Sequence, residues 1–271
     1  MLKRTITGVV LIAVLIVVML LMPAWCTGVL LSVMVALAAY ELMKTTGLVD
    51  NVYLIGIAVV TAVNVVWWCF YGMHYPWALA VLLMFVVLCF AQLLRSHGQL
   101  PFQQVAITMV AGILIPFLLS ALVRIRIMEN GVYWLAAPFV MAFLPDVGAY
   151  LVGCAIGKHK LCPNISPKKT VEGLFGGFLG GIVGMLAYAL VLEKVFGFTP
   201  NYFYAAIYGV IGAGAATFGD LMFSVIKRQT GIKDYGKLLP GHGGILDRFD
   251  SVALVAPVAE LLLLAIPFVV K

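Results

Sequence analysis

A short polar segment, residues 224–251 (SVIKRQTGIKDYGKLLPGHGGILDRFDS), holds an unusual set of reactive side chains. Its cations are Lys227, Arg228, Lys233 and Lys237, its carboxylates are Asp234, Asp247 and Asp250, and His242 stands between glycines. Gly241, Gly243 and Gly244 free the backbone to turn its N–H groups toward an anion. Phosphoryl and nucleotidyl transfer need carboxylates for a divalent metal and cations for the phosphates. The segment therefore predicts chemistry on a metal-bound polyphosphate.

Asp220 stands just before this segment, one helical turn before Ser224 and seven residues before Lys227. On a helix, this spacing places the carboxylate, the hydroxyl and the ammonium on one face. A helix-end salt bridge between Asp220 and Lys227 is the simple alternative, but the polar segment that follows favours catalysis. We predict that Asp220 and Asp247 bind Mg²⁺, which prefers oxygen ligands. His242 can donate to a phosphate or pyrophosphate oxygen, or it can bond a backbone carbonyl in a turn.

A second basic segment, residues 157–173 (GKHKLCPNISPKKTVEG), precedes these groups. Ser166, Lys168, Lys169 and Thr170 can hold phosphate oxygens. Residues 170–173 also begin a helix, and a helix N-terminus attracts anions. The alternative is a basic loop that touches lipid headgroups, and the residues alone leave both interpretations open.

Other carboxylates fall within or beside apolar stretches, where a charge must be paired or must face water. For Asp146, which follows a proline, we favour an acid that faces a cavity. For Glu41 and Glu260 we favour a structural role over a catalytic one. Glu193 stands beside Lys194 at the end of a predicted helix, so we expect a simple interfacial ion pair.

The elements that position these groups are membrane helices. Apolar residues make up 64% of the 271 residues and charged residues only 10%, which excludes a soluble globular domain. Apolar runs long enough to cross a bilayer recur along the chain. We predict an all-α, polytopic integral membrane protein with about nine spans: 5–22, 27–43, 53–71, 77–94, 104–123, 133–153, 173–193, 203–223 and 250–269.

The basic residues set the predicted orientation, because Lys and Arg accumulate in cytoplasmic loops. With the N-terminus inside, only four of the 17 Lys and Arg residues lie on the outer side: Arg124, Arg126, Lys194 and Lys271. We therefore expect a cytoplasmic N-terminus, an outer C-terminus and an active site that faces the cytoplasm. The net charge of +6 would gather at that face, where it can attract anionic lipids and polyphosphates.

The unusual polar residues gather in the second half of the chain. We expect residues 1–271 to form a single membrane-embedded unit in which 1–135 is mainly a scaffold of helices. The catalytic region is 136–271, with cytoplasmic loops at 154–172 and 224–250. Small residues recur at helical spacing over 173–184 (GLFGGFLGGIVG), which predicts close helix packing in preference to a phosphate-binding loop. We interpret the five cysteines as small apolar fillers: Cys26, Cys69, Cys89, Cys154 and Cys162.

The polar segment resembles the signature of the membrane-bound phosphatidate cytidylyltransferases, SxxKRxxxxKDxGxxLPGHGGxxDRxD. The matching residues are Ser224, Lys227, Arg228, Lys233, Asp234, Gly236, Leu239, Pro240, Gly241, His242, Gly243, Gly244, Asp247, Arg248 and Asp250. Residues 3–8 (KRTITG), 146–153 (DVGAYLVG) and 166–173 (SPKKTVEG) are also similar to family patterns, so the resemblance covers essentially the whole chain.

The resemblance implies that CTP and phosphatidate give CDP-diacylglycerol and pyrophosphate, with Mg²⁺ as cofactor and K⁺ assisting in some members. It also implies a homodimer with a funnel that opens to the cytoplasm, in the bacterial inner membrane. We expect membrane lipids as partners and no nucleic acid. The implied catalytic residues are Asp220, Asp247, Lys227, Arg228, His242 and Asp146. The implied substrate-binding residues are Ser166, Lys168, Lys169, Thr170, Ser224, Lys233, Asp234, Gly243, Gly244, Arg248 and Asp250.

Two rival functions fit the same residue types. A CTP-dependent lipid or polyprenol kinase would use similar acids but transfer the γ-phosphate and release CDP. A transporter would use buried charges as a substrate path, with acids spread through the membrane depth. A CDP-alcohol phosphotransferase is excluded, because its DGxxAR motif is absent.

Overall fold

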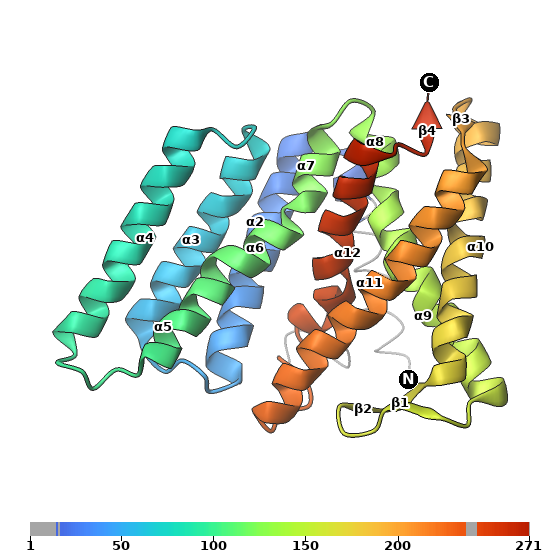
Figure 1. Ribbon diagram of the computed structural model, residues 1–271. Coiled ribbons are helices and arrows are strands. Elements are labelled where there is room, and N and C mark those ends of the chain that lie inside the picture. Colours follow the sequence, from blue (N-terminus) through green and yellow to red (C-terminus); the bar gives the residue numbers. More distant parts are fainter. Residues whose placement is uncertain (1–14, 16, 237–242, 271) are drawn as a thin grey trace. The chain divides into compact units, whose positions relative to one another are not determined.

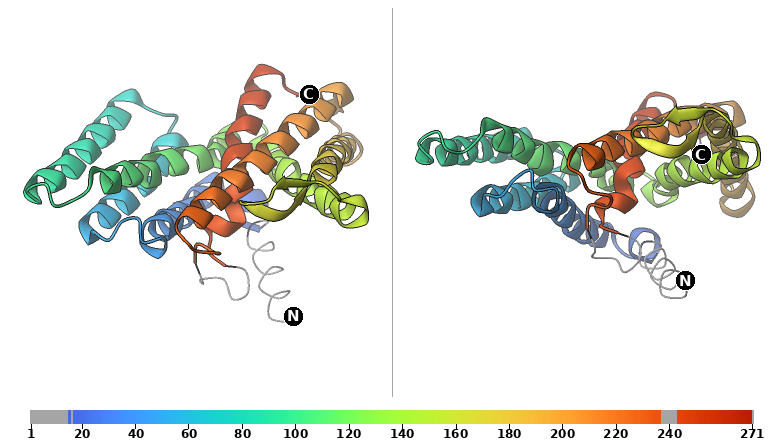
Figure 2. Two further views of the ribbon diagram at one scale, coloured as in Figure 1. Left: turned by 60° about the horizontal axis from the view of Figure 1, so that its bottom comes forward. Right: turned by 90° about the horizontal axis from the view of Figure 1, so that it is seen from below.

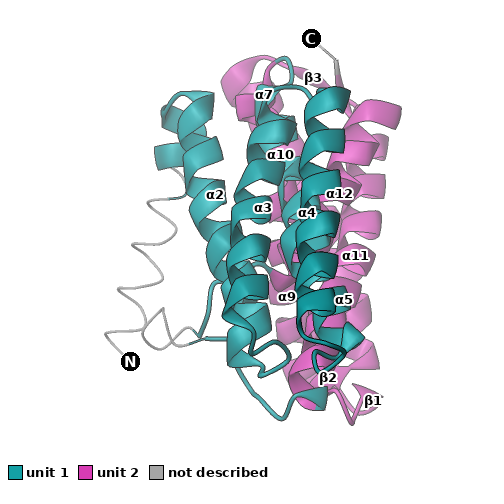
Figure 3. Ribbon diagram, turned by 90° about the vertical axis from the view of Figure 1, so that its left-hand side faces the viewer, with its two compact units in different colours: residues 1–129, 229–249 teal, residues 130–228, 250–271 magenta. Residues whose placement is uncertain are grey.

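The structure is a computed structural model that describes residues 15, 17–236 and 243–270. The chain is mainly helical and divides into two compact units (Figures 1 and 3). Unit 1 comprises residues 1–129 and 229–249, and unit 2 comprises residues 130–228 and 250–271. Each unit is thus built from stretches that are far apart in sequence. That the 271 residues fold as one membrane-embedded unit stays a prediction.

Unit 1 consists of helices joined by short turns (Figure 1). Its elements are η1 (Val17–Leu21), α2 (Ala24–Tyr40), η2 (Glu41–Thr45), α3 (Val52–Phe70), α4 (Tyr75–Arg95), α5 (Phe102–Met109), η3 (Val110–Leu114), α6 (Ile115–Leu119) and α7 (Ala121–Ile127). The η elements are π-helical turns, which often accompany functional sites because they widen the helix locally. Helix α2 passes directly into the π-helical η2, so residues 24–45 form one span.

Side-chain chemistry explains where these helices start and how closely they pack. Asn51 caps α3, because its Oδ1 accepts hydrogen bonds from the backbone N–H groups of Tyr53 (3.0 Å) and Leu54 (3.2 Å). Gly112 lets η3 approach its neighbours, since a Cβ there would lie 3.1 Å from the Cα of Ala58 in α3. The core of this unit is therefore a tightly packed set of apolar helices.

Unit 2 contains the long helices of the second half (Figure 1). Its helices are α8 (Gly131–Trp134), α9 (Ala136–Ile156), α10 (Val171–Phe196), α11 (Tyr202–Gln229) and α12 (Leu246–Ala265), of which α12 begins within the residues of unit 1. Antiparallel pairs of short strands join them: β1 (Lys160–Cys162) with β2 (Ser166–Thr170), and β3 (Thr199–Pro200) with β4 (Val269–Val270). Figure 2 shows the β1–β2 hairpin at the ends of α9 and α10.

Glycines bring α9 and α10 into backbone contact. A Cβ on Gly176 would lie 2.5 Å from the Cβ of Val152 and 2.7 Å from the carbonyl oxygen of Gly148. Gly180 repeats the pattern one turn on, since its Cβ would lie 2.7 Å from the carbonyl oxygen of Leu144. The close packing predicted for residues 173–184 is confirmed.

The predicted spans agree with the structure over most of the chain. Seven helices in the described residues are long and apolar enough to cross a membrane: Ala24–Thr45, Val52–Phe70, Tyr75–Arg95, Phe102–Ile127, Gly131–Ile156, Val171–Phe196 and Tyr202–Gln229. The predicted span 5–22 falls largely outside the described residues. The predicted span 250–269 corresponds to α12, whose N-terminal turns carry Asp247, Arg248 and Asp250 and are more polar than the other spans. A helical, polytopic membrane protein is confirmed, and the two strand pairs were not predicted.

Candidate active site

The C-terminal end of α11, which we predict to face the cytoplasm, carries Asp220, Ser224 and Lys227. The sequence predicted that these three side chains share one face of the helix. Ser224 Oγ lies 3.5 Å from Asp220 Oδ1, as expected for residues four apart on a helix. Ser224 and Lys227 are buried, while Asp220 keeps about a quarter of its side chain exposed. Gly219 leaves room beside this face, because a Cβ there would lie 3.0 Å from the carbonyl oxygen of Asp250.

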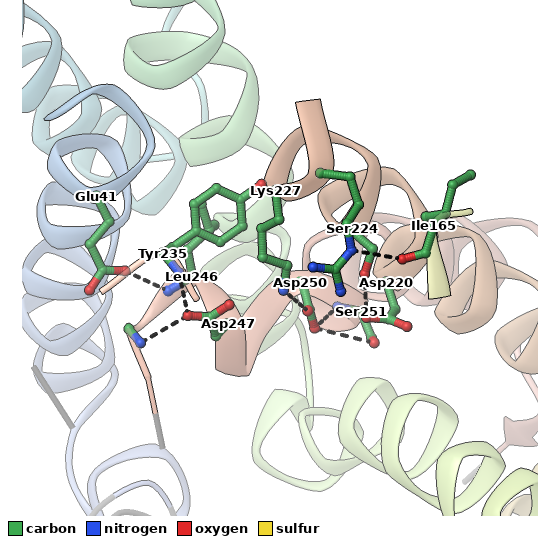
Figure 4. A network of polar contacts seen from close by, with 12 residues as sticks. Glu41, Ile165, Asp220, Ser224, Lys227, Tyr235, Leu246, Asp247, Asp250 and Ser251 are labelled. Carbon is green, nitrogen blue, oxygen red and sulfur yellow. Dashed lines mark hydrogen bonds and ion pairs between the residues drawn. The ribbon is translucent and has the colours of Figure 1, made fainter. Parts of the chain in front are cut away.

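Ion pairs in unit 2 link this face to the β1–β2 hairpin and to α12. Lys169 Nζ, at the end of β2, lies 2.5 Å from Asp220 Oδ2. Lys227 Nζ lies 3.8 Å from Asp250 Oδ2, and Figure 4 shows these two side chains pointing toward each other. The structure thus pairs Lys227 with Asp250 and Asp220 with Lys169, in place of the simple Asp220–Lys227 salt bridge. Cations and carboxylates alternate across three elements.

Asp146 joins the same cluster from α9. Its carboxylate interacts electrostatically with Lys169 and with Asp220. Pro145 precedes it inside α9, and the glycines of α10 hold this stretch close. Asp146 and Asp220, which stand more than 70 positions apart in the sequence, therefore both interact with the ammonium group of Lys169.

The β1–β2 hairpin is tied down at both of its ends. Thr170 caps α10, since its Oγ1 accepts from the Gly173 N–H at 3.1 Å, which confirms a helix start at 170–173. His159 Nδ1 lies 2.6 Å from Glu172 Oε1. Arg228 Nε donates to the carbonyl oxygen of Ile165 at 3.1 Å. The predicted loop 154–172 is therefore held as an ordered hairpin, in which the side chain of Lys169 is half-buried and that of its neighbour Lys168 is exposed.

A second cluster, in unit 1, organises the residues that flank the start of α12. Asp247 Oδ2 accepts hydrogen bonds from the backbone N–H groups of Tyr235 (2.7 Å) and Gly244 (3.0 Å). Gly243 has φ +83°, and a Cβ there would lie 2.8 Å from the same oxygen. The glycines of the predicted phosphate turn thus let a buried aspartate reach the backbone.

Glu41 also belongs to this second cluster, although nothing in the sequence indicated that it would lie there. It is 4% exposed, and its two carboxylate oxygens accept from the N–H groups of Ile245 (3.1 Å) and Leu246 (2.9 Å), as Figure 4 shows for Leu246. Its partners follow it by 204 and 205 positions, so no local pattern could have paired them. The only signal was an acid near the end of an apolar span.

The remaining candidates lie at the surface or outside the described residues. Lys233, Asp234 and Arg248 are exposed, and Ser166 is half-buried on β2. His242, with Lys237 and Gly241, lies outside the described residues. Away from the site, Glu193 forms the expected ion pair with Lys194 (2.6 Å).

The oxygen-rich composition of both clusters suits a hard cation such as Mg²⁺ better than a soft metal. Among the described residues, no group of three or more His, Cys, Asp and Glu side chains is close enough to form a metal cage. A magnesium ion held by one or two carboxylates and by the phosphates of its substrate needs no such cage. The residues present therefore fit a metal that arrives with a nucleotide.

An apolar groove of about 650 Å³ between α3 and α4 lies within unit 1. Tyr53, Gly56, Val60 and Met84 are among the residues that line it, and none of the predicted site residues does. On a helix pair with a lipid-facing composition, such a groove suits hydrocarbon. Its lining contains no charged side chain that could bind a metal or balance a phosphate.

Comparison with known proteins connects this geometry to a family. A sequence profile described as "Cytidylyltransferase family" matches residues 2–266, which include both clusters. The chain belongs to the cytidylyltransferase family. The family resemblance noted from the signature is thereby confirmed.

Curated relatives in this family carry a more specific name. A protein of Staphylococcus haemolyticus named phosphatidate cytidylyltransferase is 41% identical over 136 residues, which are 50% of this chain and 51% of the relative. A protein of Staphylococcus saprophyticus with the same name is 43% identical over 138 residues, or 51% of this chain and 52% of the relative. The chain thus matches about half the length of these cytidylyltransferases.

Proposed function

We propose that the protein is a phosphatidate cytidylyltransferase, which transfers CMP from CTP to phosphatidate and releases pyrophosphate. The observation that carries this proposal is the cluster in unit 2, where Lys169 holds Asp220 and Lys227 holds Asp250. Family membership and the names of the bacterial relatives support the choice of CTP and phosphatidate. The function falls within phospholipid synthesis.

The reaction needs little covalent help from the protein. A phosphate oxygen of phosphatidate attacks the α-phosphorus of CTP and forms a new P–O bond. The bond from the α-phosphorus to the oxygen that bridges to the β-phosphate breaks, and pyrophosphate leaves with that electron pair. Because no enzyme-bound intermediate is required, the side chains serve to position the two phosphates and to balance their charge.

The basic residues supply that charge balance. Lys169 and Lys227 are each oriented by a carboxylate, and Arg228 by the carbonyl oxygen of Ile165. A phosphate that enters can accept hydrogen bonds from such a cation while the cation's present partner stays beside it, so that no charge is left unpaired. Lys233 and Arg248 are exposed and suit the first capture of a nucleotide. The proposed substrate site is completed by Ser166, Lys168, Thr170, Ser224, Asp234, Gly243 and Gly244. We propose His242 as a hydrogen-bond donor to the leaving group.

We propose Asp220 and Asp247 as the ligands of Mg²⁺, with K⁺ as an assisting ion. When bound, the metal neutralises charge on the phosphates. Hydrogen bonds from Tyr235 and Gly244 fix the orientation of the Asp247 carboxylate, and metal ligands are typically oriented by such outer partners. Asp146 then lines the polar cavity where the lipid headgroup enters.

The proposed membrane arrangement follows the distribution of Lys and Arg. It has about nine spans, a cytoplasmic N-terminus, an outer C-terminus and an active site that faces the cytoplasm of a bacterial cell. The proposed assembly is a homodimer.

The test uses the full chain, purified in detergent, with phosphatidate, Mg²⁺ and CTP labelled at the α-phosphorus. We expect label in the lipid fraction and release of pyrophosphate. The variant Asp220→Asn should lose about two orders of magnitude in turnover and require more Mg²⁺. Glu193→Gln, whose carboxylate also pairs with a lysine but lies away from the site, is the matched control.

The labelling pattern separates the possible outcomes. Lipid labelling from CTP labelled at the γ-phosphorus, together with CDP, would assign the protein to the lipid kinases. If folded protein transferred neither label, a transporter would be the better assignment. Normal Mg²⁺-dependent turnover by Asp220→Asn would refute the metal assignment while leaving the overall reaction in place.

A further inference from the structure

Helix α12 starts without a local capping side chain of the usual kind. The first N–H groups of a helix have no partner within it and are normally satisfied by a Ser, Thr, Asp or Asn just before the helix. Here residues 243–245 are Gly, Gly and Ile, which carry no such oxygen. The cap comes from Glu41, at the junction of α2 and the π-helical η2.

Both oxygens of this carboxylate are engaged with the same backbone turn. Glu41 Oε1 accepts from the Ile245 N–H at 3.1 Å and Oε2 from the Leu246 N–H at 2.9 Å. A carboxylate at a helix N-terminus also interacts favourably with the helix dipole. Bonds to a buried, charged acceptor are among the stronger hydrogen bonds in proteins. Glu41 thus fixes both the position and the direction of the first turn of α12.

The neighbouring backbone is shaped around this carboxylate. A Cβ on Gly244 would lie 2.5 Å from Glu41 Oε2, and the three nearest atoms to it all belong to Glu41. A Cβ on Gly236 would also collide with Glu41 Oε1. The hydroxyl of Thr45, one turn along η2, donates to the carbonyl oxygen of Tyr235. The end of the first described span therefore holds both flanks of the loop that leads into α12.

We infer that Glu41 is a positioning residue for the proposed nucleotidyl-transfer site, acting through Asp247. The turn that Glu41 caps contains Asp247, and the Asp247 carboxylate in turn holds Tyr235 and Gly244. Loss of the cap should let this turn move and misplace Asp247, which we propose as a metal ligand. This inference rests on the proposed function, but its structural part does not depend on the identity of the substrates.

The first test replaces the carboxylate with its neutral isostere, Glu41→Gln, in the full chain. One of its two groups becomes an amide N–H₂ that faces a backbone N–H, so one helix amide loses its acceptor. We expect kcat to fall about tenfold or more while the KM for CTP changes less than about twofold, as for an effect on the reacting geometry. Hydrogen exchange at the amides of 245 and 246 should become about tenfold faster. Glu193→Gln should change neither quantity.

The second test is a double-mutant cycle between Glu41 and Gly244. Gly244→Ala should damage activity because its methyl group meets the Glu41 carboxylate. Glu41→Asp, which is one methylene shorter, should make room for that methyl. We therefore expect Gly244→Ala to reduce kcat about tenfold in the parent chain and less than about threefold in the Glu41→Asp chain, since contacting residues are coupled.

The outcomes are separable from those of the proposed function. Equal losses from Gly244→Ala in both chains, or exchange at 245–246 unchanged in Glu41→Gln, would overturn the positioning role. If the parent protein transferred no CMP, the proposed function would fail, and the exchange measurement together with a stability cycle on the same variants would still decide whether Glu41 caps α12.

Discussion

The glycine contact between α9 and α10 predicts that one added methyl group will loosen unit 2. In Gly176→Ala the new Cβ would lie 2.5 Å from the Cβ of Val152, whereas ordinary contacts begin near 3.4 Å. The two helices must therefore separate by about 0.9 Å at this point, because most of the atoms met are backbone or Cβ atoms that cannot rotate away. Such overpacking destabilises by about 1–3 kcal/mol.

Helix propensity acts in the opposite direction and can be measured separately. Replacing glycine with alanine inside a helix favours the helix by about 1 kcal/mol. Gly214→Ala in α11 is the matched control, because the nearest atom to its Cβ is the Cε1 of Phe178 at 4.0 Å. We expect Gly214→Ala to stabilise by up to about 1 kcal/mol and Gly176→Ala to destabilise by up to about 2 kcal/mol, a difference of roughly 1–3 kcal/mol.

The assay is thermal unfolding in detergent, followed by intrinsic fluorescence at one fixed scan rate. For a chain of this size, the difference corresponds to apparent melting temperatures that are about 2–12 °C apart. Gly176→Ala should also reduce activity, since α9 carries Asp146 and the start of α10 adjoins the hairpin with Lys169. Equal melting temperatures for the Gly176 and Gly214 variants would refute the reasoning from backbone contact.

Further predictions concern the hairpin and the membrane orientation. Lys169→Met should lower kcat/KM about tenfold or more, because it removes the charged partner of Asp220, whereas Lys160→Met, at the exposed first position of β1, should change it less than about twofold in the same assay. Thr170→Ala should lower the apparent melting temperature by about 2–4 °C through loss of the α10 cap, and Thr170→Ser should restore it. Cys154 is exposed at the end of α9, so a membrane-impermeant maleimide should label it in inside-out vesicles and not in intact cells if that end is cytoplasmic.

The fold could be predicted from the sequence wherever the pattern that determines an element lies within one short stretch of residues. Apolar length alone located the seven spans, because a bilayer imposes one helix length on all of them. The spacing of Asp220 and Ser224 predicted their contact, since residues four apart on a helix are neighbours. Thr170 predicted its own helix start, because capping is decided within three residues.

The parts that escaped prediction depend on long-range partners or on weak local preferences. The β1–β2 hairpin is short and contains Pro167 and several lysines, so it lacks the alternating pattern of a strand. Lys169 pairs with Asp220, but the sequence contains several other basic residues that could have paired with this aspartate. The sequence alone therefore could not identify Lys169 as the partner. The sequence identified Glu41 as an acid that is energetically costly within an apolar span. It could not identify the partner 204 positions away, because this partner is a backbone amide and every residue except proline has one.

Unit 1 is built from two stretches that are far apart in the sequence, and this has a consequence for how the chain folds during its synthesis. Glu41 is synthesised and inserted long before residues 229–249 exist, yet those residues provide the amides that satisfy its buried carboxylate. Until they emerge, the carboxylate must stay hydrated at the membrane surface, because an unpaired charge is expensive in lipid. Truncation after residue 228 should therefore leave the first spans inserted but incompletely packed.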